Sequence, residues 1–84
     1  MQLGKVCGSV WATKKSDKLT GSTLLIVKTK NSEIIAADTL GAGVGDTVLL
    51  LFGGAAREIS GTDAAICGIV DKTDYKRKED EYEY

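Results

Sequence analysis

The sequence predicts an all-β protein, a small five-stranded antiparallel barrel of OB-like type with a short irregular or helical segment. Three observations support this prediction. The chain has 84 residues, which is the size of one domain. Short aliphatic runs of strand length alternate with glycine-rich or polar turns. No long helical pattern of apolar residues is present in the sequence, so closing the strands on one another is the simplest way to bury these runs.

The first strand is predicted over residues 2–12. Alternation in this run places Val6, Gly8 and Val10 on one face and the odd-numbered residues on the other. Gly4 and Gly8 interrupt the run, and glycine inside a strand is typical of bulges and sharp bends. A small closed barrel requires bends of this kind.

Four further strands are predicted over residues 23–30, 33–38, 46–52 and 66–71. Asn31 and Ser32 separate the first two of these strands, which predicts a tight hairpin. The other connections are a polar loop, a glycine-rich loop and an irregular stretch with a helical turn, over residues 13–22, 39–45 and 53–65. Residues 1–71 are therefore expected to form one barrel domain. Residues 72–84 form a charged C-terminal tail, interpreted either as a disordered segment or as a strand extension or partner-docking segment.

The fourth strand indicates that the barrel needs a partner. Its aliphatic residues are continuous, whereas a strand with one face in water alternates. Val48, Leu50 and Phe52 are predicted to fill the barrel, which leaves Leu49 and Leu51 outside, together with one of the two alternating sets of residues 24–27. So short a chain has no helical layer for that outer face and buries only about 60–65% of its unfolded surface. We therefore expect a second subunit to cover it.

Composition argues against several functions. The chain has no histidine, which removes every catalytic dyad or triad that depends on imidazole, and no catalytic residue, metal site or cofactor is predicted. Eleven basic residues against twelve acidic ones do not favour strong phosphate binding, so no nucleic-acid partner is expected. No apolar run approaches the roughly 20 residues of a membrane span, and the N-terminus lacks the apolar region of a signal peptide. Cys7 and Cys67 are too distant in sequence for a CxxC pair and are interpreted as buried thiols of a cytosolic protein, with a disulfide or a pair of reactive thiols as the alternatives.

Two glycine-rich motifs are candidate functional segments. The first comprises Gly41, Gly43, Gly45 and Asp46; it lacks the Lys-Ser/Thr and the following helix of a phosphate-binding loop, so a turn with positive φ is the better interpretation. The second is the run of residues 53–57, whose small residues allow backbones to pack closely or several copies to meet around an axis. Its Arg57 is interpreted either as a surface residue or as an interface residue, able to pair with a carboxylate such as Asp46 or Asp63.

Trp11 has three possible roles, in the barrel core, as an interface anchor or as a platform for base stacking. Core or interface is favoured, because stacking proteins usually add a basic groove and more aromatic residues.

Four segments in order resemble one known family. They are MQLGKVCGSVWATKK, IAADTLGAGVGDTVLL, GGAAR and DAAICGIVD, and together they span Met1 to Asp71. In order and spacing this pattern is similar to the vertex proteins of bacterial microcompartment shells, the EutN/CcmL family. The resemblance implies a β-barrel that assembles as a cyclic homopentamer and caps the vertices of a polyhedral shell.

The same resemblance implies the partners and the site residues. The partners are further copies of the chain and hexameric shell proteins, the location is a microcompartment shell in the bacterial cytoplasm, and the protein is structural rather than an enzyme. Subunit-interface or pore positions would be Gly53, Gly54, Ala55, Ala56 and Arg57. An interface or barrel-edge loop would comprise Gly41, Gly43, Gly45 and Asp46. The chain departs from the family at Gly54 and Ala55, where members often carry serines, so the polarity of any pore there would differ. The alternative interpretation is a free-standing OB-type module that binds single-stranded nucleic acid or an oligosaccharide.

Overall fold

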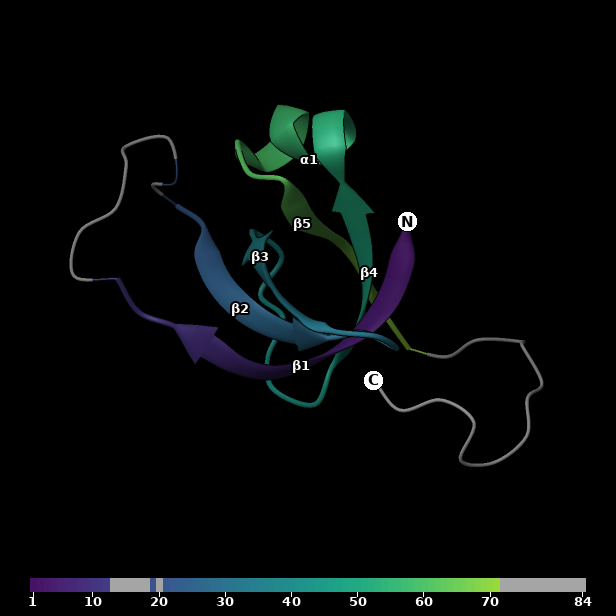
Figure 1. Cartoon of the computed structure of the whole chain (residues 1–84). Helices are drawn as coiled ribbons and strands as arrows, with labels where there is room; N and C mark the ends of the chain where they lie inside the picture. The colour runs from purple at the N-terminus through teal and green to yellow at the C-terminus, as the bar shows by residue number, and fades with distance from the viewer. Residues whose placement is uncertain (13–18, 20, 72–84) are drawn as a thin grey trace.

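The computed structural model describes residues 1–12, 19 and 21–71. In chain order the described elements are β1 (Gln2–Val10), β2 (Thr23–Lys28), β3 (Glu33–Asp38), β4 (Thr47–Phe52), α1 (Gly53–Ser60) and β5 (Ala64–Val70). Within this part of the chain the five strands close into a barrel in the order β1-β2-β3-β5-β4, and α1 sits beyond the ends of β4 and β5 (Figure 1). The predicted small five-stranded barrel is confirmed. The predicted tail, residues 72–84, lies outside the described residues, as does most of the polar loop 13–22.

The barrel is not antiparallel throughout, because β3 and β5 run parallel. A ring with an odd number of strands cannot alternate direction all the way round, so closing five strands requires one parallel pair. In the described residues that pair is joined only at Ala37 and Ala65, whereas the β2–β3 ladder holds six residue pairs. The parallel seam is therefore the shortest ladder of the barrel.

Aliphatic side chains fill the barrel interior. The buried core cluster consists of Val6, Leu25, Val27, Ala36, Val48, Leu50, Ala64 and Ile66. The predicted inward positions Val48 and Leu50 are confirmed, since neither exposes any surface. The prediction for Phe52 is wrong: its side chain is 38% exposed, because β4 leaves the barrel there and passes into α1.

A β-bulge in β1 reverses the faces of that strand. Val6 pairs with Val27, but the next pair is Gly8 with Ile26, so Cys7 is an extra residue with no partner of its own. One inserted residue exchanges the inward and outward positions beyond it. The predicted shared face of Val6, Gly8 and Val10 is therefore wrong: Val6 points into the barrel, and Gly8 pairs with a residue of the outer face.

Of the two bends that the glycines of β1 predicted, the structure has the one at Gly8 and not the one at Gly4. The register shifts next to Gly8, as expected, but it continues without interruption through Gly4. Gly4 is buried, and a Cβ added there would collide with the side chain of Val27 and lie tightly, at 3.2 Å, against that of Leu50. At this position glycine serves the close packing of the core.

A second bulge, in β5, has a local sequence similar to that of the first. Leu49 pairs with Gly68 and Leu50 with Ile66, which leaves Cys67 as the extra residue. Each bulge is thus an aliphatic residue, a cysteine and a glycine. The Sγ atoms of Cys7 and Cys67 lie 3.5 and 3.4 Å from carbonyl oxygens of the neighbouring strand, as weak thiol hydrogen bonds.

This geometry corrects the interpretation of the cysteines as buried thiols. Cys7 is exposed and Cys67 half-buried, and both are free thiols. The reason is that each is the unpaired residue of a bulge.

The turns match their sequence patterns closely. Asn31 and Ser32 lie in the predicted hairpin, where the amide of Thr29 donates to the carbonyl of Ser32 at 2.7 Å. The predicted helical turn is the full helix α1. It ends at Gly61, which adopts the left-handed conformation at φ 75° and donates its amide to the carbonyl of Arg57.

Candidate functional site

The glycine-rich loop between β3 and β4 is organised by a carboxylate from the end of β3. Asp38 is 3% exposed, and its two carboxylate oxygens accept hydrogen bonds from three successive backbone amides. The donors are Leu40 at 3.0 Å, Gly41 at 3.2 Å and Ala42 at 2.9 Å. Charged acceptors of this kind form stronger hydrogen bonds than neutral ones.

A second carboxylate closes the same loop. Asp46 accepts the amide of Gly43 at 2.8 Å through Oδ2 and donates its own amide to the Gly43 carbonyl. Backbone bonds between Gly45 and Val6, and between Val6 and Asp46, then tie the loop to β1, each at 2.9 Å. The predicted positive φ is confirmed at Gly41 and Gly45, at 89° and 96°, but Gly43 does not have one.

Four successive amides of this loop, those of residues 40–43, are already bonded by the protein's own carboxylates, which agrees with the argument against a phosphate-binding loop. Asp38 was missed by the sequence reasoning. The signal that could have identified it is an aspartate just before a glycine turn, because aspartate side chains commonly bond the backbone amides that follow them.

The second candidate segment, Gly53 to Arg57, forms the first turns of α1. Gly53 has a φ of 66° and donates its amide to the Asp63 carbonyl at 3.0 Å, which anchors the start of the helix beside the start of β5. Ala56 is fully buried against the barrel, whereas Gly54 and Ala55 are exposed. A Cβ added at Gly53 or Gly54 would meet no described atom within 4 Å. This end of α1 therefore presents small residues to open space.

Arg57 pairs with Asp63, one of the two carboxylates that the sequence suggested. Its Nε lies 2.8 Å from Asp63 Oδ1, and both side chains are largely exposed. Asp46 instead bonds Gly43, in the loop at the other end of β4. In the described residues Arg57 thus joins α1 to β5 within one chain.

The two candidate segments lie at opposite ends of β4 rather than in one site. The glycine-rich loop precedes β4 and α1 follows it, at the foot and the top of the barrel in Figure 1. Six strand residues separate them by about 20 Å. Within one subunit the two segments therefore form separate sites.

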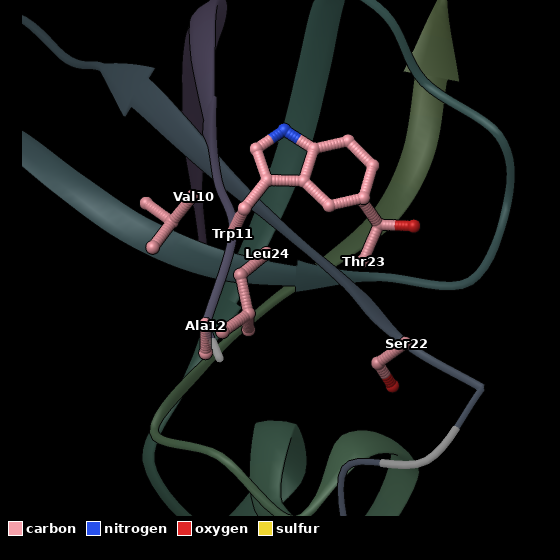
Figure 2. Close-up of a pocket in the computed structure, with 6 residues that line it drawn as sticks. All are labelled: Val10, Trp11, Ala12, Ser22, Thr23 and Leu24. Carbon is pink, nitrogen blue, oxygen red and sulfur yellow. The ribbon is translucent and has the colours of Figure 1, made fainter. Parts of the chain in front are cut away.

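A third feature, which the sequence reasoning missed, is a pocket at the paired ends of β1 and β2 (Figure 2). It encloses about 290 Å³ and is lined by Val10, Trp11, Ala12, Ser22, Thr23 and Leu24. Trp11 is 87% exposed, which excludes the core from its three suggested roles and leaves the interface anchor and the stacking platform. The continuous aliphatic run of β2 was the available signal, but the bulge that turns Val10 outward beside Leu24 was not visible in the sequence.

The described residues contain no group of three cysteine, aspartate or glutamate side chains placed to hold a metal ion. No helix among them is long and apolar enough to cross a membrane.

Comparison with known proteins places these features in a family. The model of a family described as "Ethanolamine utilisation protein EutN/carboxysome" matches residues 1–71. The bacterial microcompartment shell vertex protein GrpN of Rhodospirillum rubrum is 40% identical over 83 residues, covering 84% of this chain and 93% of GrpN. The carboxysome shell vertex protein CcmL of Thermosynechococcus vestitus is also 40% identical over 83 residues, covering 84% of each chain.

The fold comparison agrees with the sequence comparison. The solved structure of GrpN, a pentameric microcompartment shell protein, superposes with a TM-score of 0.80 and covers 89% of this chain and 100% of that one. The barrel, the glycine-rich loop and the described helix all lie within residues 1–71, the part of the chain that the family model matches. By sequence and by fold, this chain belongs to the EutN/CcmL family.

Proposed function

We propose that this chain forms a cyclic homopentamer that caps the vertices of a bacterial microcompartment shell. The observation that carries the proposal is the agreement with GrpN, a pentameric shell protein, at 40% identity and a TM-score of 0.80 over that whole chain. The exposed aliphatic and aromatic side chains on the described barrel support it, because a lone subunit leaves them in water.

The mechanism is geometric. Hexagonal tiles alone form flat sheets, and closing such a sheet requires five-fold corners, which a cyclic pentamer with head-to-tail interfaces supplies. The partners would then be hexameric shell proteins, and the location a shell in the bacterial cytoplasm. Burial of apolar surface between subunits, at about 25 cal/mol per Å² before association costs, would drive assembly.

Two segments would shape the ring. Gly53, Gly54, Ala55, Ala56 and Arg57 would lie near the five-fold axis or the adjoining subunit contact. The exposure of Gly54 and Ala55, with open space over Gly53 and Gly54, supports this placement. Gly41, Gly43, Gly45 and Asp46 would form a barrel-edge loop at a neighbouring subunit, supported by the carboxylates that hold the loop in one conformation.

This role requires no catalysis, cofactor or nucleic acid. The relatives reported above are structural shell proteins, which supports a non-enzymatic role. The near balance of basic and acidic residues supports the absence of a nucleic-acid partner. The relatives also favour the shell function over the alternative of a free-standing OB-type binding module.

Co-assembly with a hexamer-forming shell protein tests the proposal. Electron microscopy of the mixture should show closed polyhedral particles with this chain at their five-fold corners. The hexamer-forming protein alone should give sheets or tubes. Closed particles of the same kind with and without this chain, or particles from which it is absent, would contradict the proposal.

A further inference from the structure

The end of the β1–β2 ladder carries the most exposed aromatic side chain among the described residues. Trp11 is 87% exposed and is the only tryptophan of the chain. A large aromatic ring in water is unfavourable unless something else covers it, and tryptophan is among the residues most enriched at the energetic centres of protein interfaces.

The apolar surface continues from Trp11 along the outside of the barrel. Beyond the bulge at Cys7, Val10 pairs with Leu24 and Gly8 with Ile26, and these residues are half-buried. Ile26 pairs in turn with Ile35 on β3, which is 55% exposed. We call this the β1–β2–β3 surface, comprising Val10, Trp11, Leu24, Ile26 and Ile35.

The pocket beside Trp11 gives this surface a recess without charge. Figure 2 shows its six lining residues on two adjacent chain segments, and each of them is apolar or carries a hydroxyl group. About 290 Å³ is at or below the lower limit of small-molecule sites, which usually hold 300 to 1,000 Å³. The recess therefore suits one or two apolar side chains of a protein partner better than a charged peptide or a metabolite.

We propose that a neighbouring copy of this chain covers the β1–β2–β3 surface, with Trp11 as its anchoring side chain. This inference rests on the ring of five subunits proposed above and names the face by which one subunit receives the next. In a head-to-tail ring every subunit must offer one face to each neighbour. This face has what such a contact needs: an aromatic anchor, a recess beside it and uncharged aliphatic residues around it. A solved relative with the same fold is a pentamer, so a second copy is the occupant that the comparison supports.

The single tryptophan makes the inference directly measurable. Intrinsic fluorescence should be recorded across a dilution series while native mass spectrometry reports the assembly state of the same samples. On assembly the emission maximum should move to shorter wavelength, and quenching by acrylamide should fall several-fold. A wild-type chain that assembles while its indole emits and quenches like free tryptophan would overturn the inference but leave the proposed function standing. A wild-type chain that stays monomeric would overturn both.

Matched substitutions provide a second test. Trp11→Glu places a carboxylate on the surface, whereas Ile59→Glu places one at an exposed apolar position of α1 that does not line the pocket. Trp11→Glu should raise the concentration of half-assembly by about 30-fold or more, the effect expected of an interface hot spot. Ile59→Glu should change the concentration of half-assembly far less. Trp11→Phe should keep most of the assembly that Trp11→Glu loses. Equal effects of the two glutamate substitutions would contradict the assignment of this face.

Discussion

Asp38 is the residue on which the glycine-rich loop depends. Its carboxylate is buried and accepts three backbone amides, so the loop is held by hydrogen bonds from its own chain. The sequence indicated a turn here from its glycines alone. Composition alone does not say which of the twelve acidic residues holds the turn, but the position of Asp38 at the end of β3, just before the glycines, was an unused signal.

Asp38→Ala should lower the free energy of unfolding by about 3 kcal/mol, because it leaves amides of a tight loop without their charged acceptor. Urea unfolding followed by circular dichroism at a fixed subunit concentration measures the change. Asp63→Ala serves as the control, since that side chain is largely exposed. An effect of Asp38→Ala no larger than that of Asp63→Ala would contradict the role given to Asp38.

Substitutions at Gly4 and Gly43 distinguish a glycine that core packing requires from one that can be replaced. Gly4→Ala should destabilise the fold by about 1–3 kcal/mol, because the added methyl group collides with Val27 and crowds Leu50 in a closely packed core. Gly43→Ala should be tolerated, since its φ is not positive and no described atom lies within 4 Å of the added Cβ. Thermal unfolding of both variants at one protein concentration decides the matter, and similar melting temperatures would contradict this distinction.

The two bulges show at the scale of elements where prediction from sequence reaches its limit. The strand segments followed from their aliphatic runs, and the five strands lie within a few residues of their predicted bounds. The faces of β1 did not follow, because one unpaired residue, Cys7, exchanges inside and outside beyond it. A bulge is set by the register between two strands, which alternation within one strand does not contain.

Helix α1 and strand β5 are joined by the ion pair of Arg57 and Asp63, and this pair allows intrachain and intersubunit roles to be separated. Arg57→Ala should change the stability of the fold by less than about 1 kcal/mol, as is usual for an exposed pair. If Arg57 also contacts a neighbouring subunit, as its place in the second candidate segment suggests, the same substitution should weaken assembly more than it alters the β-sheet circular dichroism signal.

Asp63→Ala is the matched control, because it removes the same intrachain ion pair but keeps the guanidinium. Native mass spectrometry should find Asp63→Ala less impaired in assembly than Arg57→Ala. Equal assembly of wild type and both variants would rule out an intersubunit role for Arg57.

At the scale of the whole molecule, the barrel follows from its strands, but its closure and its assembly do not. Five strands in a ring require the parallel β3–β5 seam, a constraint that appears only when the strands are counted as a closed set. The continuous aliphatic runs of β2 and β4 indicated a partner, because one chain of 84 residues cannot cover both faces of such strands. The number of copies in a closed ring depends on the angle between the two contacting faces of each subunit. The pattern of the sequence does not reveal that angle. Family membership provided the number.

The mass of the wild-type protein in solution tests the central claim most directly. Native mass spectrometry, supported by light scattering at micromolar concentration, should find a dominant species of five subunits. A stable monomer under these conditions, or a closed ring of any other number, would contradict the account of this chain as a pentameric vertex protein.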